Sequence, residues 1–241
     1  MNKPLTAMLL VTAILIPPNL AGAVSLPRTF TANYEFTRNG ILLGEVQRTL
    51  RANGDGSYVY ESVSQAGGMI AWFVKDKLIE RSTWRWTGSR IKPQTYLYHH
   101  FGGKKQRRVE LAFDWQNGIV TNTVDNDPWT MKIPENTLDK LVYQFSIMID
   151  LQNNRSELIY PVADGGELKT YHFEIVGEET LQTPMGVFKA TRINRIGGKR
   201  PTTIWCAKEL DYMAVRIEQT EDNGTQLLMQ LRDLEWHAPS P

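Results

Sequence analysis

The chain has 241 residues, 27 of them basic and 26 acidic, and it holds a single cysteine. Charges balanced this closely create no overall field that would draw the chain to nucleic acid or to an anionic membrane, so nucleic acid is excluded as a partner. The lone Cys206 excludes an intramolecular disulfide, and its apolar neighbours Trp205 and Ala207 predict a buried, unreactive thiol.

The first residues have the pattern of an export signal. Lys3 supplies a positive charge, residues 5–16 form an apolar run, and Pro17-Pro18 ends it. Ala21 and Ala23 then offer the small side chains that a signal peptidase reads. The run is shorter than the roughly twenty apolar residues that span a bilayer. We therefore predict a cleavable signal peptide over residues 1–23.

Cleavage after Ala23 would release a mature chain that we expect in the periplasm and not spanning the membrane. Losing Lys3 lowers the number of basic residues from 27 to 26, equal to the 26 acidic ones. Ala23 also stands where a lipoprotein would have its modified cysteine, so no lipid anchor is expected. No linker rich in Pro, Gly or Ser divides the mature chain, which predicts a single β-rich domain over residues 24–241.

Short segments with alternating apolar and polar residues, separated by turn residues, make up most of the mature chain. This period of two is typical of half-buried strands, and Asn39-Gly40 and Asn117-Gly118 are strong hairpin signals. An apolar run over residues 69–74 fits neither a helix nor a strand clearly. We predict strands over residues 30–37, 41–50, 58–64, 77–87, 91–100, 109–115, 119–124, 129–133, 158–162, 171–175, 187–193, 202–206, 213–219 and 227–231.

One segment, residues 138–151, has the period of a helix. Its apolar residues recur at helical spacing, Asn136 could cap it, Asp139 would lie in its first turn, and Asn153-Asn154 would end it. The apolar surface is wider than one stripe, so we expect the helix inside a curved sheet or across its mouth. The predicted fold is mainly β, a strongly curved antiparallel sheet of about a dozen strands (an open barrel or β-spiral) with one central apolar helix.

Two stretches carry a resemblance to a known family. Residues 179–193 read E-T-x-x-T-P-x-G-x-F-x-A-x-R-I, and residues 204–219 read I-W-x-A-x-x-L-x-Y-x-x-V-R-I-E-Q. The pattern resembles an exported bacterial family known as domain of unknown function 3108. The hairpin at residues 34–44 and Thr137-Leu138-Asp139 extend the resemblance over nearly all of the mature chain.

This resemblance implies a periplasmic protein of Gram-negative bacteria with a curved antiparallel β architecture. The implied fold is similar to that of half-barrel lipoprotein carriers and of β-spiral proteins of the cell envelope. The family has no accepted catalytic residues, so none are transferred to this chain. The likeness to lipid carriers is an analogy of fold, which does not assign a function.

Few polar residues form a pattern that points to chemistry. His99 and His100 are adjacent on a predicted strand and would point to opposite faces, so they are not expected to bind one metal ion. Asp125 and Asp127 precede Pro128 in what reads as an ordinary turn. No nucleophile motif of the G-x-S-x-G kind occurs. We predict no metal site, no cofactor and no catalytic residue.

Aromatic residues are the best candidates for a ligand pocket. Most of the seven tryptophans are expected in the core, but one or two could line an apolar cavity beside the predicted helix. The candidate ligand-binding residues are Trp72, Trp84, Trp86, Trp129 and Tyr143. The basic residues Lys104, Lys105, Arg107 and Arg108 form a predicted hairpin tip, which could meet lipid headgroups or an acidic partner, or simply be solvated.

The leading hypothesis is a non-catalytic periplasmic protein of envelope assembly or maintenance. It would bind a lipid or other apolar ligand, or an envelope protein, in its curved sheet. The alternative is a glycan-binding or glycan-hydrolysing envelope protein, which as an enzyme would need two carboxylates about 5–10 Å apart across an open cleft. A purely structural scaffold is a third hypothesis.

Overall fold

The computed structural model describes residues 28–67, 76–88, 90–102 and 106–238. The predicted signal peptide, the run at residues 69–74, Trp72, Lys104 and Lys105 lie outside these ranges. The strands are β1 (Phe30–Arg38), β2 (Ile41–Ala52), β3 (Ser57–Ala66), β4 (Lys77–Trp86), β5 (Ile91–Phe101), β6 (Arg107–Asp114), β7 (Ile119–Val124), β8 (Asp127–Lys132), β9 (Leu138–Asp139), β10 (Leu158–Asp164), β11 (Glu167–Thr183), β12 (Gly186–Ile196), β13 (Thr202–Ala207), β14 (Met213–Thr220) and β15 (Gln226–Trp236). The described residues also form one α-helix, α1 (Tyr143–Gln152), and a short 3₁₀ helix, η2 (Lys208–Leu210).

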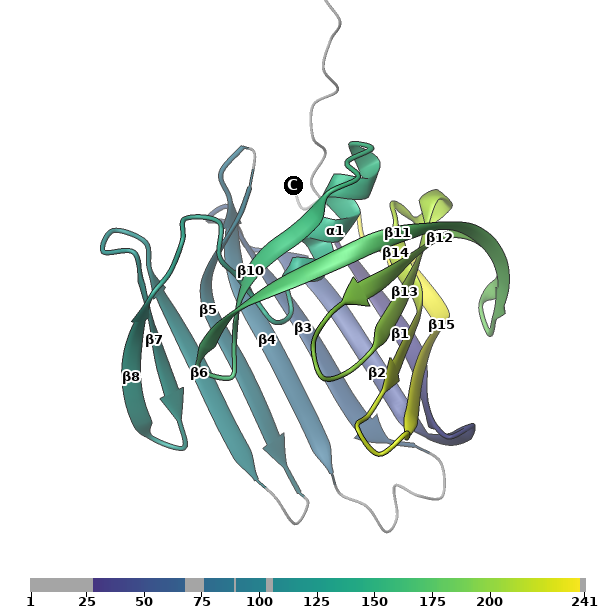
Figure 1. The fold of residues 1–241 in the computed structure, drawn as a ribbon, viewed down its shortest axis with the longest axis horizontal. Helices are drawn as coiled ribbons and strands as arrows, with labels where there is room; N and C mark the ends of the chain where they lie inside the picture. Colours follow the sequence, from purple (N-terminus) through teal and green to yellow (C-terminus); the bar gives the residue numbers. More distant parts are fainter. Residues whose placement is uncertain (1–27, 68–75, 89, 103–105, 239–241) are drawn as a thin grey trace, which may run out of the picture.

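All fifteen strands belong to one sheet, in the order β8-β7-β6-β5-β4-β3-β2-β1-β15-β14-β13-β12-β11-β10-β9. Neighbours in the sheet are also neighbours in the chain, except where β1 pairs with β15. The sheet therefore consists of two antiparallel meanders, β1–β8 and β10–β15, which are joined through β1 and β15, and β9 adds to the edge of β10 in parallel. The sheet bends strongly without closing (Figure 1). This confirms the predicted mainly β fold with a curved, open sheet.

Local turn chemistry explains several of the hairpins. Asn39 and Gly40 have φ of 48° and 78°, as the tight turn between β1 and β2 requires. Asp125 and Asn126 also have positive φ, and they alone form the turn into β8, so this strand starts at Asp127 instead of Trp129. The strand predicted over residues 171–175 is part of a longer strand, β11, which has an irregular register between Ile175 and Gly177.

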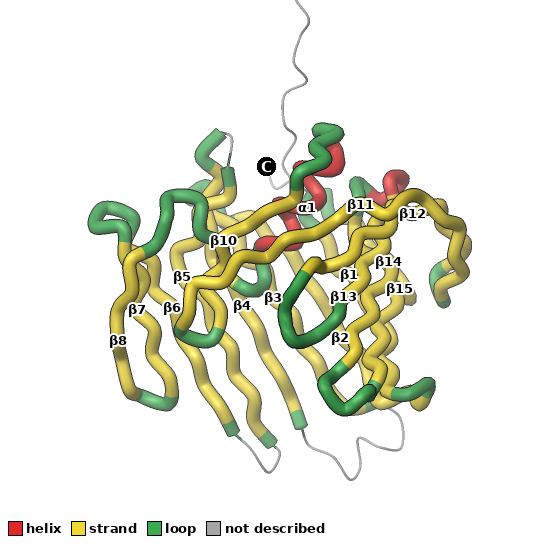
Figure 2. Tube along the Cα trace, viewed as in Figure 1, coloured by secondary structure: helices red, strands yellow, loops and turns green. Residues whose placement is uncertain are grey.

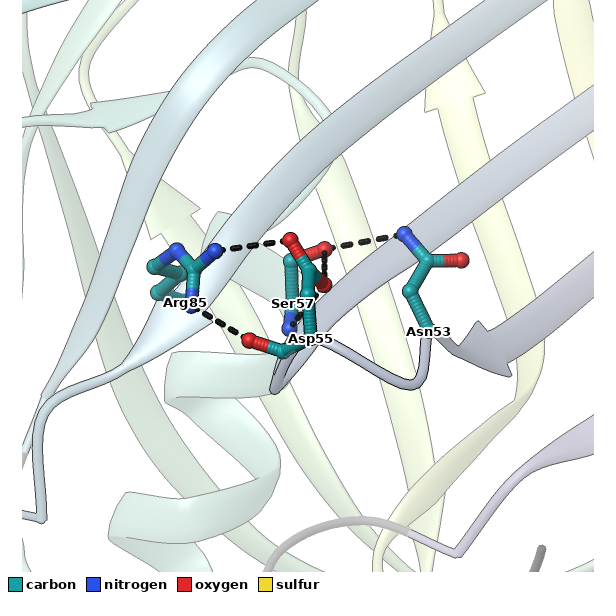
Figure 3. Close-up of polar contacts among 4 residues, drawn as sticks. All are labelled: Asn53, Asp55, Ser57 and Arg85. Atoms are coloured by element: carbon teal, nitrogen blue, oxygen red, sulfur yellow. Dashed lines mark hydrogen bonds and ion pairs between the residues drawn. The ribbon is translucent and has the colours of Figure 1, made fainter.

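The turn between β2 and β3 is fixed by polar side chains (Figure 3). The Asp55 carboxylate accepts hydrogen bonds from the backbone N–H of Ser57 at 3.0 Å and from its hydroxyl at 2.7 Å. Arg85 of β4 donates to the Asp55 carboxylate and to its carbonyl oxygen, both at 2.7 Å. Asn53 donates to the Ser57 hydroxyl at 2.9 Å. Three consecutive strands are thus held in register at this end of the sheet.

The helix starts later than predicted. Leu138 and Asp139 form the short strand β9, which pairs in parallel with Val162 and Ala163 of β10, and α1 begins only at Tyr143. The predicted cap Asn136 is therefore outside the helix. Of the periodic apolar residues before Tyr143, Leu138 pairs with β10, and Leu141 and Val142 lie in a turn held by the Asp139 carboxylate. Local sequence does not reveal this pairing. The predicted end at Asn153 is confirmed.

α1 lies on the concave side of the sheet, behind β10 and β11 in the view of Figure 2. Phe145 in its first turn packs against Tyr60 of β3 with a ring-centroid distance of 4.5 Å, and against Phe30 of β1 at 6.3 Å. Tyr143 stacks on Phe173 of β11 at 5.8 Å. The helix thus connects the two meanders, which confirms the prediction of a central apolar helix. No helix in the described ranges has the length and apolar character needed to cross a bilayer.

Candidate binding site

A cavity of about 390 Å³, partly open to solvent, lies between the beginning of α1 and the concave face of the sheet. Strands β1–β4 line one side, β11–β15 line the other, and the segment from Lys140 to Gln144 covers it. Its lining is predominantly apolar, and it includes Phe36, Val46, Leu78, Ile217, Leu228 and Met229. A concave, mainly apolar surface with a few polar groups is typical of small-molecule sites.

Arg48 is the most unusual side chain of this cavity. It points inward from β2 with only 8% of its surface exposed. Its Nη1 donates to the Gln144 side-chain oxygen at 2.7 Å, and its Cζ lies 5.2 Å from the centre of the Tyr34 ring. Its Nε is buried and has no hydrogen-bond partner among the described residues. A buried guanidinium that lacks a carboxylate partner is costly, because the desolvation of its charge is poorly compensated.

Two more cations line the cavity. The Arg195 guanidinium of β12 stacks 3.6 Å from the centre of the Tyr171 ring, and Lys140 is exposed, 5.6 Å from the ring of Tyr98. Burial raises the pKa of Tyr143 to about 12, although the charges of Arg48 and Arg195 both favour its ionised form. Both arginines are therefore close enough to act on the Tyr143 hydroxyl, which makes this part of the cavity electropositive.

Glu80 is the one carboxylate among the described residues of this lining. Its Oε1 accepts a hydrogen bond from the Tyr96 hydroxyl at 2.6 Å. Burial and the nearby charge of Glu80 both raise the pKa of Tyr96, so the tyrosine stays a neutral donor. The cavity thus has three cations against one acid. It offers no pair of carboxylates for acid–base catalysis within the described residues.

Asp139 lies beside the cavity but has a structural task. Its Oδ1 accepts from the backbone N–H groups of Leu141 and Val142 at 2.8 and 2.9 Å, and its Oδ2 accepts from the Ser82 hydroxyl of β4 at 2.5 Å. These bonds hold the turn that leads into α1 and tie β9 to β4. Complete burial raises the pKa of this carboxyl to about 6 despite the three donors.

The predicted ligand-binding residues are at different places. Tyr143 lines the cavity described above, whereas Trp84 is fully buried in the core, stacked on Tyr58 at 4.5 Å. Trp86 lines a second cavity of about 350 Å³ at the other end of α1. Trp129, on edge strand β8, is 38% exposed. Trp72 lies outside the described residues.

Sequence reasoning missed Arg48, Glu80, Arg195 and Lys140. Arg48, Glu80 and Arg195 were detectable in the sequence, because each is a charged residue at an inward-facing position of a strand. Arg48 alternates with Val46 and Leu50, which are both buried. An ionisable residue at an inward position of an apolar face indicates either a buried ion pair or a site.

Other polar features noted in the sequence have structural partners. Arg216 and Glu218, which lie two residues apart on β14, form an ion pair, and the guanidinium of Arg216 lies 5.1 Å from the centre of the Trp205 ring. His100 lies 3.5 Å from Asp76. Cys206 is buried as predicted, and burial raises the pKa of its thiol to about 12. The described residues contain no group of three or more His, Cys, Asp or Glu side chains arranged to hold a metal ion.

Comparison with known proteins gives a family match and a likeness of fold. The model of the family described as "Protein of unknown function (DUF3108)" matches residues 29–232. A β-barrel-like protein of the domain of unknown function DUF1849 from Brucella abortus is 8% identical, and the match covers 87% of this chain and 98% of that one, with a TM-score of 0.56. For MucB the identity is 11% and the TM-score 0.37, over 89% of this chain and 55% of MucB, too weak a likeness to carry an argument. No curated protein matches the chain. The likeness to the DUF1849 protein shows the fold alone.

Proposed function

The chain belongs to the DUF3108 family, whose description assigns no function, and we propose that it binds an apolar ligand in the cavity beneath α1. The proposal includes a single domain over residues 24–241, a periplasmic location, and a non-catalytic role in assembly or maintenance of the cell envelope. The location rests on the export signal in the sequence, and the envelope role rests on an exported, charge-balanced and β-rich chain with one unusually apolar helix.

The observation that supports binding is the cavity itself. Protein interiors are close-packed, and voids larger than a water molecule are few. The described residues enclose more than one hollow, but the cavity of about 390 Å³ beneath α1 has a mainly apolar lining, whereas the cavity of about 350 Å³ beside Trp86 is lined by charged side chains such as Arg90, Asp150 and Arg155. A mainly apolar hollow of this size is favourable only when an apolar molecule covers its lining. Its size is within the range of about 300–1,000 Å³ that is usual for small-molecule sites. A hollow of this size and shape suits a small molecule better than the surface of a partner protein.

The glycan alternative has no comparable support. A glycosidase needs two carboxylates that flank the scissile bond, and Glu80 is the one acid in the described lining. Stacking on a sugar ring would need an exposed tryptophan at the cavity, but Trp84 is buried in the core and Trp129 lies on edge strand β8. We therefore keep apolar binding as the single proposal.

Binding of the neutral dye Nile red to the mature protein tests the proposal, alongside native mass spectrometry and lipid extraction after gentle purification. Ile217→Trp would fill the cavity from β14 and is expected to weaken dye binding about tenfold or more. Tenfold corresponds to about 1.4 kcal/mol, less than the gain from burying one large apolar side chain.

Ile196→Trp is the matched control for this experiment. Ile196 is 43% exposed and lies outside the cavity lining, so its replacement should leave dye binding unchanged. Thermal unfolding of both variants shows that they are folded. Saturable binding that Ile217→Trp leaves intact, or no binding and no co-purified apolar molecule, would contradict the proposed function.

A further inference from the structure

We propose that the ligand of this cavity is an anionic amphiphile, a hydrocarbon chain with one acid group, and that the acid group pairs with Arg48. This inference rests on the proposed function and specifies the chemical class of its ligand. The acid group is a carboxylate or a phosphate, since both accept the two parallel hydrogen bonds that a guanidinium donates.

Arg48 differs from other arginines of the chain in its burial and in its lack of a carboxylate partner. Arg85 pairs with Asp55 at 2.7 Å and Arg108 with Glu110 at 2.7 Å, and in each pair both side chains are substantially exposed. Arg48 is 8% exposed, yet it forms no ion pair with a carboxylate among the described residues; its side-chain partners are the neutral Gln144, Tyr34 and Tyr60. The most deeply buried of these charges thus lacks the partner that the exposed ones have.

The cavity lining has an excess of positive charge. Arg48 is buried, Arg195 is half-buried and Lys140 is exposed, so the three cations extend from the interior of the cavity towards solvent. Two acids oppose them. Glu80, in the lining, accepts from the Tyr96 hydroxyl, and its charge also acts on Arg48 without a hydrogen bond between the two side chains. Asp164, outside the lining, is acted on by the charge of Lys140 and binds Lys169 at 3.0 Å. A positive charge remains at Arg48 and Arg195 that an anionic ligand group would neutralise.

Apart from these charged residues, much of the cavity lining is apolar. Val46 and Met229 are buried, whereas Phe36, Leu78, Ile217 and Leu228 are only partly buried. An acid group at Arg48 would therefore leave a hydrocarbon chain along these side chains and towards the open side. A small inorganic anion would leave this apolar surface without contact, and an uncharged hydrocarbon would leave the Arg48 charge unpaired. An amphiphile satisfies both parts of the lining.

The test compares ligands that differ only in charge. Displacement of Nile red from the mature protein is measured with palmitate, with palmitoyl lysophosphatidate and with hexadecanol, which has the same chain but no charge. We expect at least one acid to bind about tenfold to a hundredfold more tightly than hexadecanol, the usual range for hydrogen bonds to a charged group. The stronger of the two acids identifies carboxylate or phosphate as the source of the charge.

Arg48→Met keeps the length of the side chain and removes its charge, so it should abolish the preference for acids while hexadecanol binding is retained. Arg51→Met is the matched control on the same strand, since the Arg51 side chain is 57% exposed, and it should keep the preference. Equal affinity of the wild-type protein for acids and hexadecanol would overturn the inference even if Arg48→Met does not fold. That result, with Nile red still bound, would leave the proposed function standing, whereas absence of all binding would contradict both.

Discussion

Asp139→Asn is expected to change how the stability of this protein depends on pH. Asp139 is completely buried, and burial raises the pKa of its carboxyl from 3.8 to about 6 against the effect of hydrogen bonds from Ser82, Val142 and Leu141. The nearby charge of Glu80 raises it further. Asparagine keeps the shape of the side chain and an oxygen that can accept from the two backbone N–H groups, but it cannot ionise.

The sign follows from the proton that the folded state retains. Between pH 3.8 and about 6 the folded protein holds a proton on Asp139 that the unfolded chain has lost, so the free energy of unfolding falls as pH rises. The contribution is fully present below pH 3.8 and is lost as pH rises through 6. With pKa values of 3.8 in the unfolded chain and about 6 in the folded protein, the free energy of unfolding loses about 2.5 kcal/mol between pH 4 and pH 7.

Urea unfolding of the wild-type protein and of Asp139→Asn at pH 4, 5, 6 and 7 measures this term. The difference in free energy of unfolding, wild type minus variant, should fall by about 2.5 kcal/mol across this range, because all other groups titrate in both proteins. Asp55→Asn is a control of opposite sign, since hydrogen bonds from Ser57 lower the pKa of the exposed Asp55. A difference for Asp139→Asn that stays constant, or that rises with pH, would refute the reasoning.

Three further outcomes are expected. Phe145→Ala should lower the free energy of unfolding by about 3–5 kcal/mol in urea titrations, because it leaves a void between α1 and the aromatic rings of β1, β3 and β4; a loss under 1 kcal/mol would contradict this packing. Gly166→Ala should destabilise by about 1–3 kcal/mol, because Gly166 has a φ of +83° and an added Cβ would lie 2.2 Å from the Trp129 ring. Trp129→Ala should restore part of that loss, and no rescue would argue against the contact. Cys206, with its thiol pKa raised to about 12, should react with a thiol reagent at least a hundredfold faster in urea than in the folded protein, and comparable rates would contradict its burial.

The predictability of the fold differs between its strands and its helix. Residues 213–219 were predicted from strict alternation and lie within β14, because that strand has one face in the core. The middle of β11 faces solvent on both sides around Val176 to Thr180, so its alternation is lost and its length could not be predicted. The predicted start of α1 was wrong because Leu138 and Asp139 form a strand that pairs with β10. This contact joins segments more than twenty residues apart in the chain.

The candidate site was less accessible from sequence than the fold. Arg48 could have been noticed as a charge between the buried Val46 and Leu50. Nothing in the sequence shows, however, that it lacks a carboxylate partner or that Arg195 lines the same cavity. That juxtaposition depends on the sheet curling until β2 and β12 face each other across α1. The sequence-based prediction named tryptophans and no arginine as ligand-binding residues, although aromatic side chains such as Trp84 are common in any core.

The pairing of β1 with β15 has a consequence for the order of folding. It joins residues such as Phe30 and Trp236, whose separation spans almost the whole described chain. Each meander consists of hairpins that can form early and locally, but this junction must close a very long loop, and contacts of that kind slow folding. Until β15 docks, the edges of β1 and β14 remain open to pairing with other chains. The cavity takes its walls from both meanders, so we expect ligand binding to appear only with this last step and to report that folding is complete.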